Sequence, residues 1–411
     1  MKEANKNKPS AESGPLTGLR VLELGHYVSA PFCTRLLADL GAEIIKVEAP
    51  RGGDPMRANG RQTKGRSLWW SSLARNKKLI TLDLRTEAGQ ALALQLASTS
   101  DVVVENFRAG QLEKWNLGWD TLQQANPRTI LVRISGFGQQ GPYSKRVSFA
   151  PIAEAVGGLT YVTGGPNTTS PSRPNISLGD SITGLNAFGM LLAAVYERDV
   201  GGTGRGRCID IAMFESVFSM MDAAVSEYSA LGVVRAPSAT TVVFSPSGSF
   251  QAGDGTWVFI TASGNAVFRR LAHAIGRSEL IDDPRFVENE NRVQNRAELA
   301  EIISSWISER SASDVESVFN AASVPASRIY SVEDCVKDPH YKARGSILEV
   351  EDPISGKILH PPIAAKFDSD GSQPSVRWAG TELGEHNDEV YAGMLGLSAQ
   401  EMQELRTAGV I

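Results

Sequence analysis

Short β-branched runs alternate with helical periodicity from residue 19 to about residue 138, and this alternation restricts the fold more than any other feature. The runs are LRVLEL, AEIIKVE, LITLDL, DVVVENF and TILVRISGF, and between them lie segments of helical spacing such as PFCTRLLADLG and EAGQALALQLASTS. Strand and helix in strict alternation indicate parallel βαβ units, with helices covering a buried sheet. We therefore expect an α/β fold whose large domain holds a Rossmann-like parallel sheet.

The chain is long enough for more than one domain, because its 411 residues exceed what one hydrophobic core usually supports. The segment RAPSATTVVFSPSGSFQAGDG is rich in small and turn residues and indicates a boundary. We expect a large domain from residues 1–220 and 340–411, a small α+β domain at 245–325, and linkers at 221–244 and 326–339. The tail contains GSILEVEDP, GKILHPP and LGEHNDEVYAGMLG, which predict strands and a closing helix that return to the large domain.

Composition and spacing exclude several classes of protein. Acidic residues exceed basic ones by 46 − 41 = 5, so no overall positive field favours nucleic acid. The cysteines Cys33, Cys208 and Cys335 are far apart and predict neither a zinc site nor a disulfide scaffold. The N-terminus is polar, and no uncharged run approaches the roughly 20 residues of a membrane span. We expect a cytoplasmic protein. The turn ELGHYVSAP lacks the G-x-G-x-x-G fingerprint of dinucleotide-binding proteins, which disfavours a nicotinamide dehydrogenase.

Asp180 lies in LGDSITGLNAFGMLLAAVYERD, at the start of a helix whose next charged residue is Glu197. Aspartate is a favoured N-cap, so a capping role is one interpretation. A helix N-terminus also favours an ionised carboxylate and offers N–H donors to a ligand. Because an ionised, partly dehydrated carboxylate is a usable nucleophile, catalysis is the other interpretation. These residues alone leave both open.

In the order of its sequence motifs, the chain resembles the family III CoA-transferases, the class of formyl-CoA:oxalate and carnitine CoA-transferases. The resemblance extends nearly end to end, from PLTGLRVLELGHYVSAPFC through RNKKLITLDL, DVVVENFRAGQLEKWNLGW, GDSITGL and TGRGRCIDIAM to LGEHNDEV. It implies that Asp180 is the catalytic aspartate, which forms an acyl anhydride and then an aspartyl-CoA thioester. CoA is then a substrate, and neither a cofactor nor a metal is implied. The resemblance also implies an interlocked dimer, either a homodimer or a heteromer with a related subunit.

The resemblance suggests which residues meet the substrates. CoA is expected to contact Asn106, Phe107 and a basic residue further on, Lys114, while Gly179 permits close approach of ligand to backbone. Lys77 and Arg51 are further candidates for the CoA phosphates, together with Lys78, Arg57 and Arg108. Asp54 and Glu105 are interpreted as structural acids that orient loops.

The chain also departs from formyl-CoA transferases. Val28 stands where those enzymes have a gating glutamine, and Phe149 and Ala150 stand where they have a tyrosine and a glutamate. With Val28 and Phe149 on the acyl side we expect acids larger and less polar than oxalate. Arg146 and Arg173 would suit a second carboxylate, as in a succinyl-type donor or another dicarboxylic acid.

Two alternatives remain open. An α-methylacyl-CoA racemase-like enzyme needs a histidine and an aspartate as opposed bases. The chain has histidines only at positions 26, 273, 340, 360 and 386, and none directly before VGGLTYVTGG, where that base is expected. His26 is interpreted as a residue that packs or forms local hydrogen bonds. The second alternative is a non-catalytic subunit of a CoA-transferase heteromer, which the presence of Asp180 disfavours.

Overall fold

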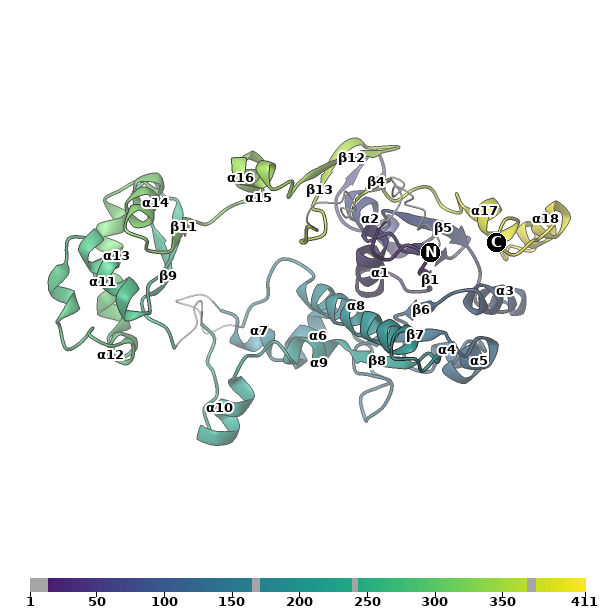
Figure 1. Cartoon of the computed structure of the whole chain (residues 1–411), viewed down its shortest axis with the longest axis horizontal. Helices are drawn as coiled ribbons and strands as arrows, with labels where there is room; N and C mark the ends of the chain where they lie inside the picture. Colours follow the sequence, from purple (N-terminus) through teal and green to yellow (C-terminus); the bar gives the residue numbers. More distant parts are fainter. Residues whose placement is uncertain (1–13, 165–170, 239–242, 368–374) are drawn as a thin grey trace, which may run out of the picture. The chain divides into compact units, whose positions relative to one another are not determined.

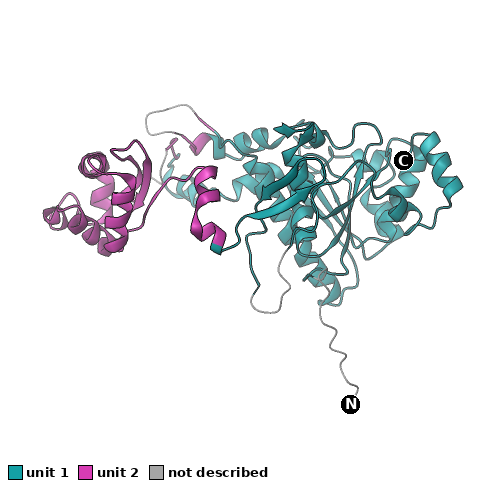
Figure 2. Ribbon diagram, turned by 90° about the horizontal axis from the view of Figure 1, so that it is seen from above, with its two compact units in different colours: residues 1–160, 173–234, 343–411 teal, residues 161–172, 235–342 magenta. Residues whose placement is uncertain are grey.

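The computed structural model describes residues 14–164, 171–238, 243–367 and 375–411 (Figure 1). It divides into two compact units (Figure 2). Unit 1 consists of Met1–Thr160, Arg173–Val234 and Ala343–Ile411, and unit 2 consists of Tyr161–Ser172 and Arg235–Lys342. Unit 2 is therefore wider than the expected 245–325. It includes Tyr161–Ser172, which was expected in the large domain, and the segment 326–339, interpreted as a linker, holds β11 (Ala326–Arg328) and α15 (Val332–Lys337).

Unit 1 is built on a six-stranded parallel sheet with the strand order β5-β2-β1-β6-β7-β8. The strands are β1 (Arg20–Glu23), β2 (Glu43–Glu48), β5 (Lys77–Thr81), β6 (Val102–Glu105), β7 (Ile130–Ser135) and β8 (Cys208–Ala212). This order is that of a doubly wound dinucleotide-binding sheet, with a reversal between β1 and β6. The expected α/β class with a large parallel sheet is confirmed.

Helices cover both faces of this sheet, since alternate side chains of each strand point to opposite sides. Val103 belongs to the core on one face, whereas Val102 and Val104 belong to the core on the other. The first face is covered by α3 (Glu87–Ser98), α4 (Gln111–Lys114), α5 (Trp119–Ala125), α17 (Asn387–Tyr391) and α18 (Ala399–Thr407). The second is covered by α1 (Ser29–Asp39), α6 (Ala150–Val156), α8 (Leu178–Asp199) and α9 (Met213–Phe218).

The C-terminal tail of unit 1 is tied to the edge strand β5. The Leu79 N–H donates to Nδ1 of His386 over 3.1 Å, and the Thr81 N–H donates to Oδ1 of Asn387 over 2.9 Å. Earlier in the chain than His386, β12 (Leu348–Asp352) and β13 (Gly356–His360) form an antiparallel hairpin.

The remaining elements are η1 (Pro55–Arg57), a 3₁₀ helix, β3 (Gln62–Thr63), β4 (Arg66–Ser67), α2 (Leu68–Leu73), α7 (Leu159–Val162) and α10 (Ala224–Leu231).

Unit 2 is an α+β unit with an antiparallel sheet in the order β11-β10-β9. Its strands are β9 (Ser247–Gln251), β10 (Trp257–Thr261) and β11 (Ala326–Arg328). Its helices are α11 (Asn265–Ala274), η2 (Ser278–Ile281), α12 (Asn289–Gln294), α13 (Arg296–Ser308), α14 (Ala312–Ala321) and α15 (Val332–Lys337), followed by α16 (Pro339–Ala343). Phe268, Phe286 and Phe319 are buried at its centre, which gives this unit a hydrophobic core of its own.

Helix α8 is the one helix of the described residues with the length and apolarity of a membrane span. Its face containing Thr183, Ala187 and Leu191 is buried in unit 1. Gly184 lets α8 approach α1 closely, because a Cβ at this position would lie 2.9 Å from the carbonyl oxygen of Ser29. These contacts are those of a core helix, so we infer no membrane segment from it. The cytoplasmic location stays a prediction.

Candidate active site

A cavity of about 240 Å³ opens at the carboxyl edge of the unit 1 sheet. Its walls come from the loops after β1, β6 and β7, from the segment before α6, and from the first turn of α8. The strand order reverses between β1 and β6, and ligands of open α/β sheets bind at such a switch point. Of the predicted site residues, the cavity brings together Asn106, Phe107, Phe149 and Asp180.

Asp180 lies in the first turn of α8 and is not its cap. The N-cap is Ser177, whose side chain makes no capping hydrogen bond. The capping interpretation of Asp180 is therefore wrong. In the described part of the chain the Asp180 carboxylate accepts no hydrogen bond, and it lines the cavity half-buried. The side chain is therefore available to a ligand.

The surroundings of Asp180 disfavour its charged form. Burial raises the pKa of this carboxyl to about 7, the nearby carboxylate of Glu154 adds to the increase, and Arg173 acts in the opposite direction. Burial is the largest of these causes, so loss of hydration favours the neutral acid, whereas the sequence had led us to expect the ionised carboxylate.

Glu154 of α6 contacts the residue before Asp180. Its Oε1 accepts a hydrogen bond of 2.9 Å from the Gly179 N–H, and its Oε2 accepts one of 2.9 Å from Nε of Arg173. A Cβ at position 179 would come within 3.0 Å of the Glu154 Cγ. Gly179 therefore makes room for Glu154, which corrects the expectation that it makes room for a ligand. Sequence reasoning missed Glu154, although it is the single charged residue in the helix APIAEAV.

Asn106 holds the loop after β1. Its Oδ1 accepts from the His26 N–H over 2.8 Å, and its Nδ2 donates to the His26 carbonyl over 2.7 Å. The ring of Phe107 packs edge-on against His26, with centroids 5.2 Å apart. Asn106 therefore forms part of the cavity wall, while its amide is occupied by the protein.

His26 also lines the cavity. Its Nδ1 is buried without a hydrogen-bond partner in the described residues. Burial is the main cause that lowers the pKa of this imidazole, which favours its neutral form. From the sequence, His26 was expected to pack or to form local hydrogen bonds, because nothing in a loop sequence shows which cavity a ring will border.

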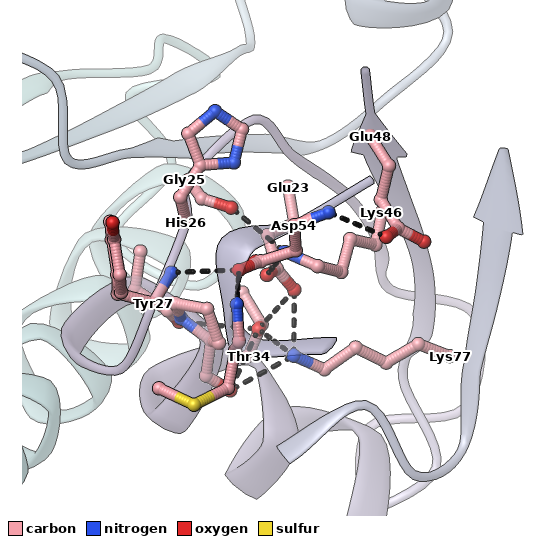
Figure 3. Close-up of polar contacts among 12 residues, drawn as sticks. Glu23, Gly25, His26, Tyr27, Thr34, Lys46, Glu48, Asp54 and Lys77 are labelled. Carbon is pink, nitrogen blue, oxygen red and sulfur yellow. Dashed lines mark hydrogen bonds and ion pairs between the residues drawn. The ribbon is translucent and has the colours of Figure 1, made fainter. Parts of the chain in front are cut away.

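Charged side chains form a buried cluster beneath the loop after β1 (Figure 3). Nζ of Lys77 donates to Oε2 of Glu23 over 2.7 Å, to Oγ1 of Thr34 over 2.9 Å and to the carbonyl of Pro31 over 2.9 Å. The expectation that Lys77 binds a CoA phosphate is corrected, because its side chain is fully buried and its three donor positions are filled.

Asp54 links the same cluster to the cavity (Figure 3). Its carboxylate pairs with Lys46 over 2.9 Å and accepts a hydrogen bond of 3.2 Å from the Tyr27 N–H. Tyr27 has a φ of 60°, which a non-glycine residue adopts only when its surroundings hold it. The interpretation of Asp54 as an acid that orients a loop is confirmed, as is that of Glu105, which accepts from the Phe107 N–H over 2.6 Å.

Val28 does not line the cavity. It is 6% exposed and packs with Met56, Trp70 and Leu79, so the expectation that it borders the acyl group is corrected. The side chain of a residue just before a helix can face either the core or a neighbouring cavity, and here that of Val28 faces the core.

The basic candidates differ in position. Arg108 and Arg146 are exposed and line the cavity, whereas Arg173 pairs with Glu154. Arg51 follows β2, and Lys114 ends α4; both are exposed and lie outside the lining. Among the described residues no group of three or more histidines, cysteines or acids is arranged to hold a metal.

Comparison with known proteins supports the resemblance seen in the sequence. A family model described as CoA-transferase family III matches residues 16–387. The chain is 42% identical to a succinyl-CoA–D-citramalate CoA-transferase of Chloroflexus aurantiacus, over 97% of this chain and 98% of that protein. It is 37% identical to the beta subunit of a succinyl-CoA–L-malate CoA-transferase of the same organism, over 97% and 98%. A CAIB/BAIF family protein from Brucella suis has a similar structure, with a TM-score of 0.81, 30% identity and coverage of 93% and 99%.

Proposed function

Because the chain belongs to CoA-transferase family III, we propose that Asp180 is the nucleophile that carries CoA from an acyl-CoA donor to a carboxylic acid. The observation that supports this most directly is the Asp180 carboxylate itself. It borders the cavity at the switch point of the sheet, and no described residue donates a hydrogen bond to it. A carboxylate with a structural role would be occupied by such donors.

The proposed reaction has four steps. Asp180 attacks the thioester carbonyl, the C–S bond breaks, and an acyl-aspartyl anhydride and CoA thiolate form. The thiolate attacks the aspartyl carbonyl and releases the donor acid, which leaves an aspartyl-CoA thioester. The acceptor carboxylate attacks this thioester, releasing the thiolate and forming a second anhydride. The thiolate finally attacks the acceptor carbonyl, so that the new acyl-CoA leaves and the Asp180 carboxylate is restored.

The loop after β6 is the proposed CoA platform. Phe107 and Arg108 lie in the cavity wall, where an aromatic face and a guanidinium suit the adenine and the phosphates. Arg51, in the loop after β2, and Lys114, at the end of α4, are exposed and are proposed as additional phosphate contacts.

For the substrates, we propose succinyl-CoA as donor and a dicarboxylic acid as acceptor. Several relatives are named for succinyl-CoA as donor. Arg146 borders the same cavity as Asp180, beside the apolar side chains of Val147 and Phe149. A guanidinium in an otherwise apolar wall suits an acyl group that carries a second carboxylate at its far end.

The assembly is proposed to be an interlocked dimer, with a second copy or a related subunit. Helix α10 has no buried residue although Val225, Tyr228 and Leu231 are large and apolar. Leu185 and Met190 of α8 are exposed as well. Apolar helix faces of this kind normally pack against protein.

The racemase-like alternative has one supporting observation, because His26 and Asp180 border the same cavity. A two-base enzyme would exchange the α-proton of a 2-methylacyl-CoA with deuterium from D₂O, whereas the proposed transfer leaves that proton in place. The relatives compared above are named CoA-transferases, so we favour transfer. A non-catalytic subunit would show neither reaction.

The decisive experiment replaces Asp180 with asparagine. Purified enzyme is incubated with succinyl-CoA and dicarboxylic acids, and new acyl-CoA species are detected by mass spectrometry. We expect Asp180→Asn to lower transfer by several orders of magnitude, because an amide forms no anhydride. With wild type and acyl-CoA alone, acyl or CoA mass should remain on the peptide containing Asp180. A folded Asp180→Asn variant with near-normal transfer, free of deamidation, would refute the mechanism.

A further inference from the structure

Helix α8 begins without a cap of its own. Its first turn leaves N–H groups without intrahelical partners, as every helix does. Ser177 makes no side-chain capping bond. The one described side chain that accepts a hydrogen bond from this turn belongs to Glu154 of α6. The Gly179 N–H therefore has an acceptor although Asp180 does not supply it.

The contact is closely fitted. The Glu154 side chain is 0% exposed, so no water contacts its carboxylate. The Gly179 N–H and Nε of Arg173 donate hydrogen bonds to it instead. A methyl group at position 179 would press against this side chain, since the added Cβ would lie 3.0 Å from Cγ and 3.2 Å from Oε1 of Glu154. A buried carboxylate with two such partners holds both of them in place.

We propose that Glu154 is a positioning residue, which fixes the first turn of α8 and keeps the Asp180 carboxylate directed at the cavity. This inference rests on the proposed role of Asp180. Gly179 is adjacent to Asp180, so displacement of its amide moves the nucleophile. By accepting from Gly179, Glu154 also supplies the capping bond for which the Asp180 side chain would otherwise compete.

Glu154 has an electrostatic effect in addition. Its negative charge and that of Asp180 repel, which favours the protonated form of Asp180, whereas Arg173 favours the ionised form. Four other titratable or cationic side chains border the cavity, namely His26, Tyr27, Arg108 and Arg146. Of the basic groups, Arg173 is the one that acts on the pKa of Asp180, and a neutral His26 adds no charge.

The test measures kcat/KM against pH for Glu154→Gln and Arg173→Gln, because the acid limb of this profile reports the free enzyme's ionisations. Glutamine at 154 keeps an oxygen for the Gly179 N–H but removes the charge, so the limb should move to lower pH. Arg173→Gln should move it to higher pH. If Glu154 and Arg173 only stabilised the fold, neither replacement would move the acid limb.

The positioning role of Glu154 is tested with Glu154→Ala. Removing the acceptor should lower kcat by about 10- to 100-fold, the order expected for a displacement of about 1 Å, with a smaller change in KM. Glu154→Gln should recover most of this loss. The matched control is Asp39→Asn, which breaks a buried pair with Arg75 of 2.6 Å outside the cavity; it should lower stability and leave the acid limb where it is.

The outcomes separate this inference from the proposed function. If Asp180→Asn abolishes transfer while a folded Glu154→Ala variant keeps the wild-type kcat, the positioning role of Glu154 is refuted and the nucleophile stands. If Glu154→Gln and Arg173→Gln leave the acid limb unmoved, the electrostatic effect is refuted. If Asp180→Asn retains transfer, the proposed function fails first. Should Glu154→Ala not fold, Glu154→Gln still decides on the charge effect, because its oxygen keeps the hydrogen bond to the Gly179 N–H while the acid limb should still move to lower pH.

Discussion

The ammonium group of Lys77 lies 2.7 Å from Oε2 of Glu23, and both side chains are fully buried. Lys46 pairs with the other oxygen of Glu23 over 2.8 Å, so one carboxylate joins two strands, β2 and β5, to β1. This cluster lies directly beneath the loop that forms one wall of the candidate active site (Figure 3). It therefore connects the stability of the sheet with the shape of the cavity.

The first prediction concerns Lys77 and Lys114. Lys77→Met leaves Glu23 buried with one cation fewer, and breaking a buried pair typically costs about 3–5 kcal/mol of unfolding free energy. Lys114→Ala should leave stability nearly unchanged, since Lys114 is exposed, and should raise the KM for acyl-CoA several-fold. Urea unfolding and steady-state kinetics measure the two effects. Equal stability of Lys77→Met and wild type would contradict the buried cluster.

The second prediction concerns the stability of the wild type as a function of pH. The pKa of Asp180 is raised to about 7 in the folded chain, against about 3.9 for an unfolded aspartate. An acid with a raised folded pKa contributes stability that is complete below about pH 4 and is lost as pH rises to about 7. Relative to wild type, Asp180→Asn should therefore gain in Tm across this interval. A difference in Tm that is independent of pH would disprove the shift.

The third prediction concerns acceptor choice. If Arg146 binds the far carboxylate, Arg146→Gln should lower kcat/KM by about 10- to 100-fold, which corresponds to the 1.5–3 kcal/mol of a charged hydrogen bond. The loss should occur with glutarate and not with pentanoate, which has no second carboxylate. Arg205→Gln serves as the control, because Arg205 is exposed and lies outside the cavity. Equal losses with both acids would exclude this role of Arg146.

The fourth prediction concerns assembly. Light scattering should give a mass twice that of one chain at micromolar concentration, because an interlocked dimer buries far more than the roughly 1,600 Å² of a standard interface. Replacing Leu231, which is 73% exposed in α10, with aspartate should weaken the dimer. A stable wild-type monomer would eliminate the interlocked arrangement.

Part of the site could be recognised from sequence because its signals are local or carried by motifs. Asp180 follows from the block GDSITGL, and the loop NFRAG from its place after a strand. Glu154 was not recognised, since its partner Gly179 is 25 positions away and an acid in a short helix is usually a solvated surface residue.

The amino-acid sequence by itself determined the parallel α/β sheet and the family, because periods of two and 3.6 residues and ordered motifs are properties of neighbouring positions. Only the tertiary structure decided which charges are buried and what they face. Lys77 and Glu23 are 54 positions apart, and the pKa of Asp180 depends on burial and on Glu154. Hydration and Coulomb energies follow distances in space, so no local pattern could predict the filled donors of Lys77 or the raised pKa of Asp180.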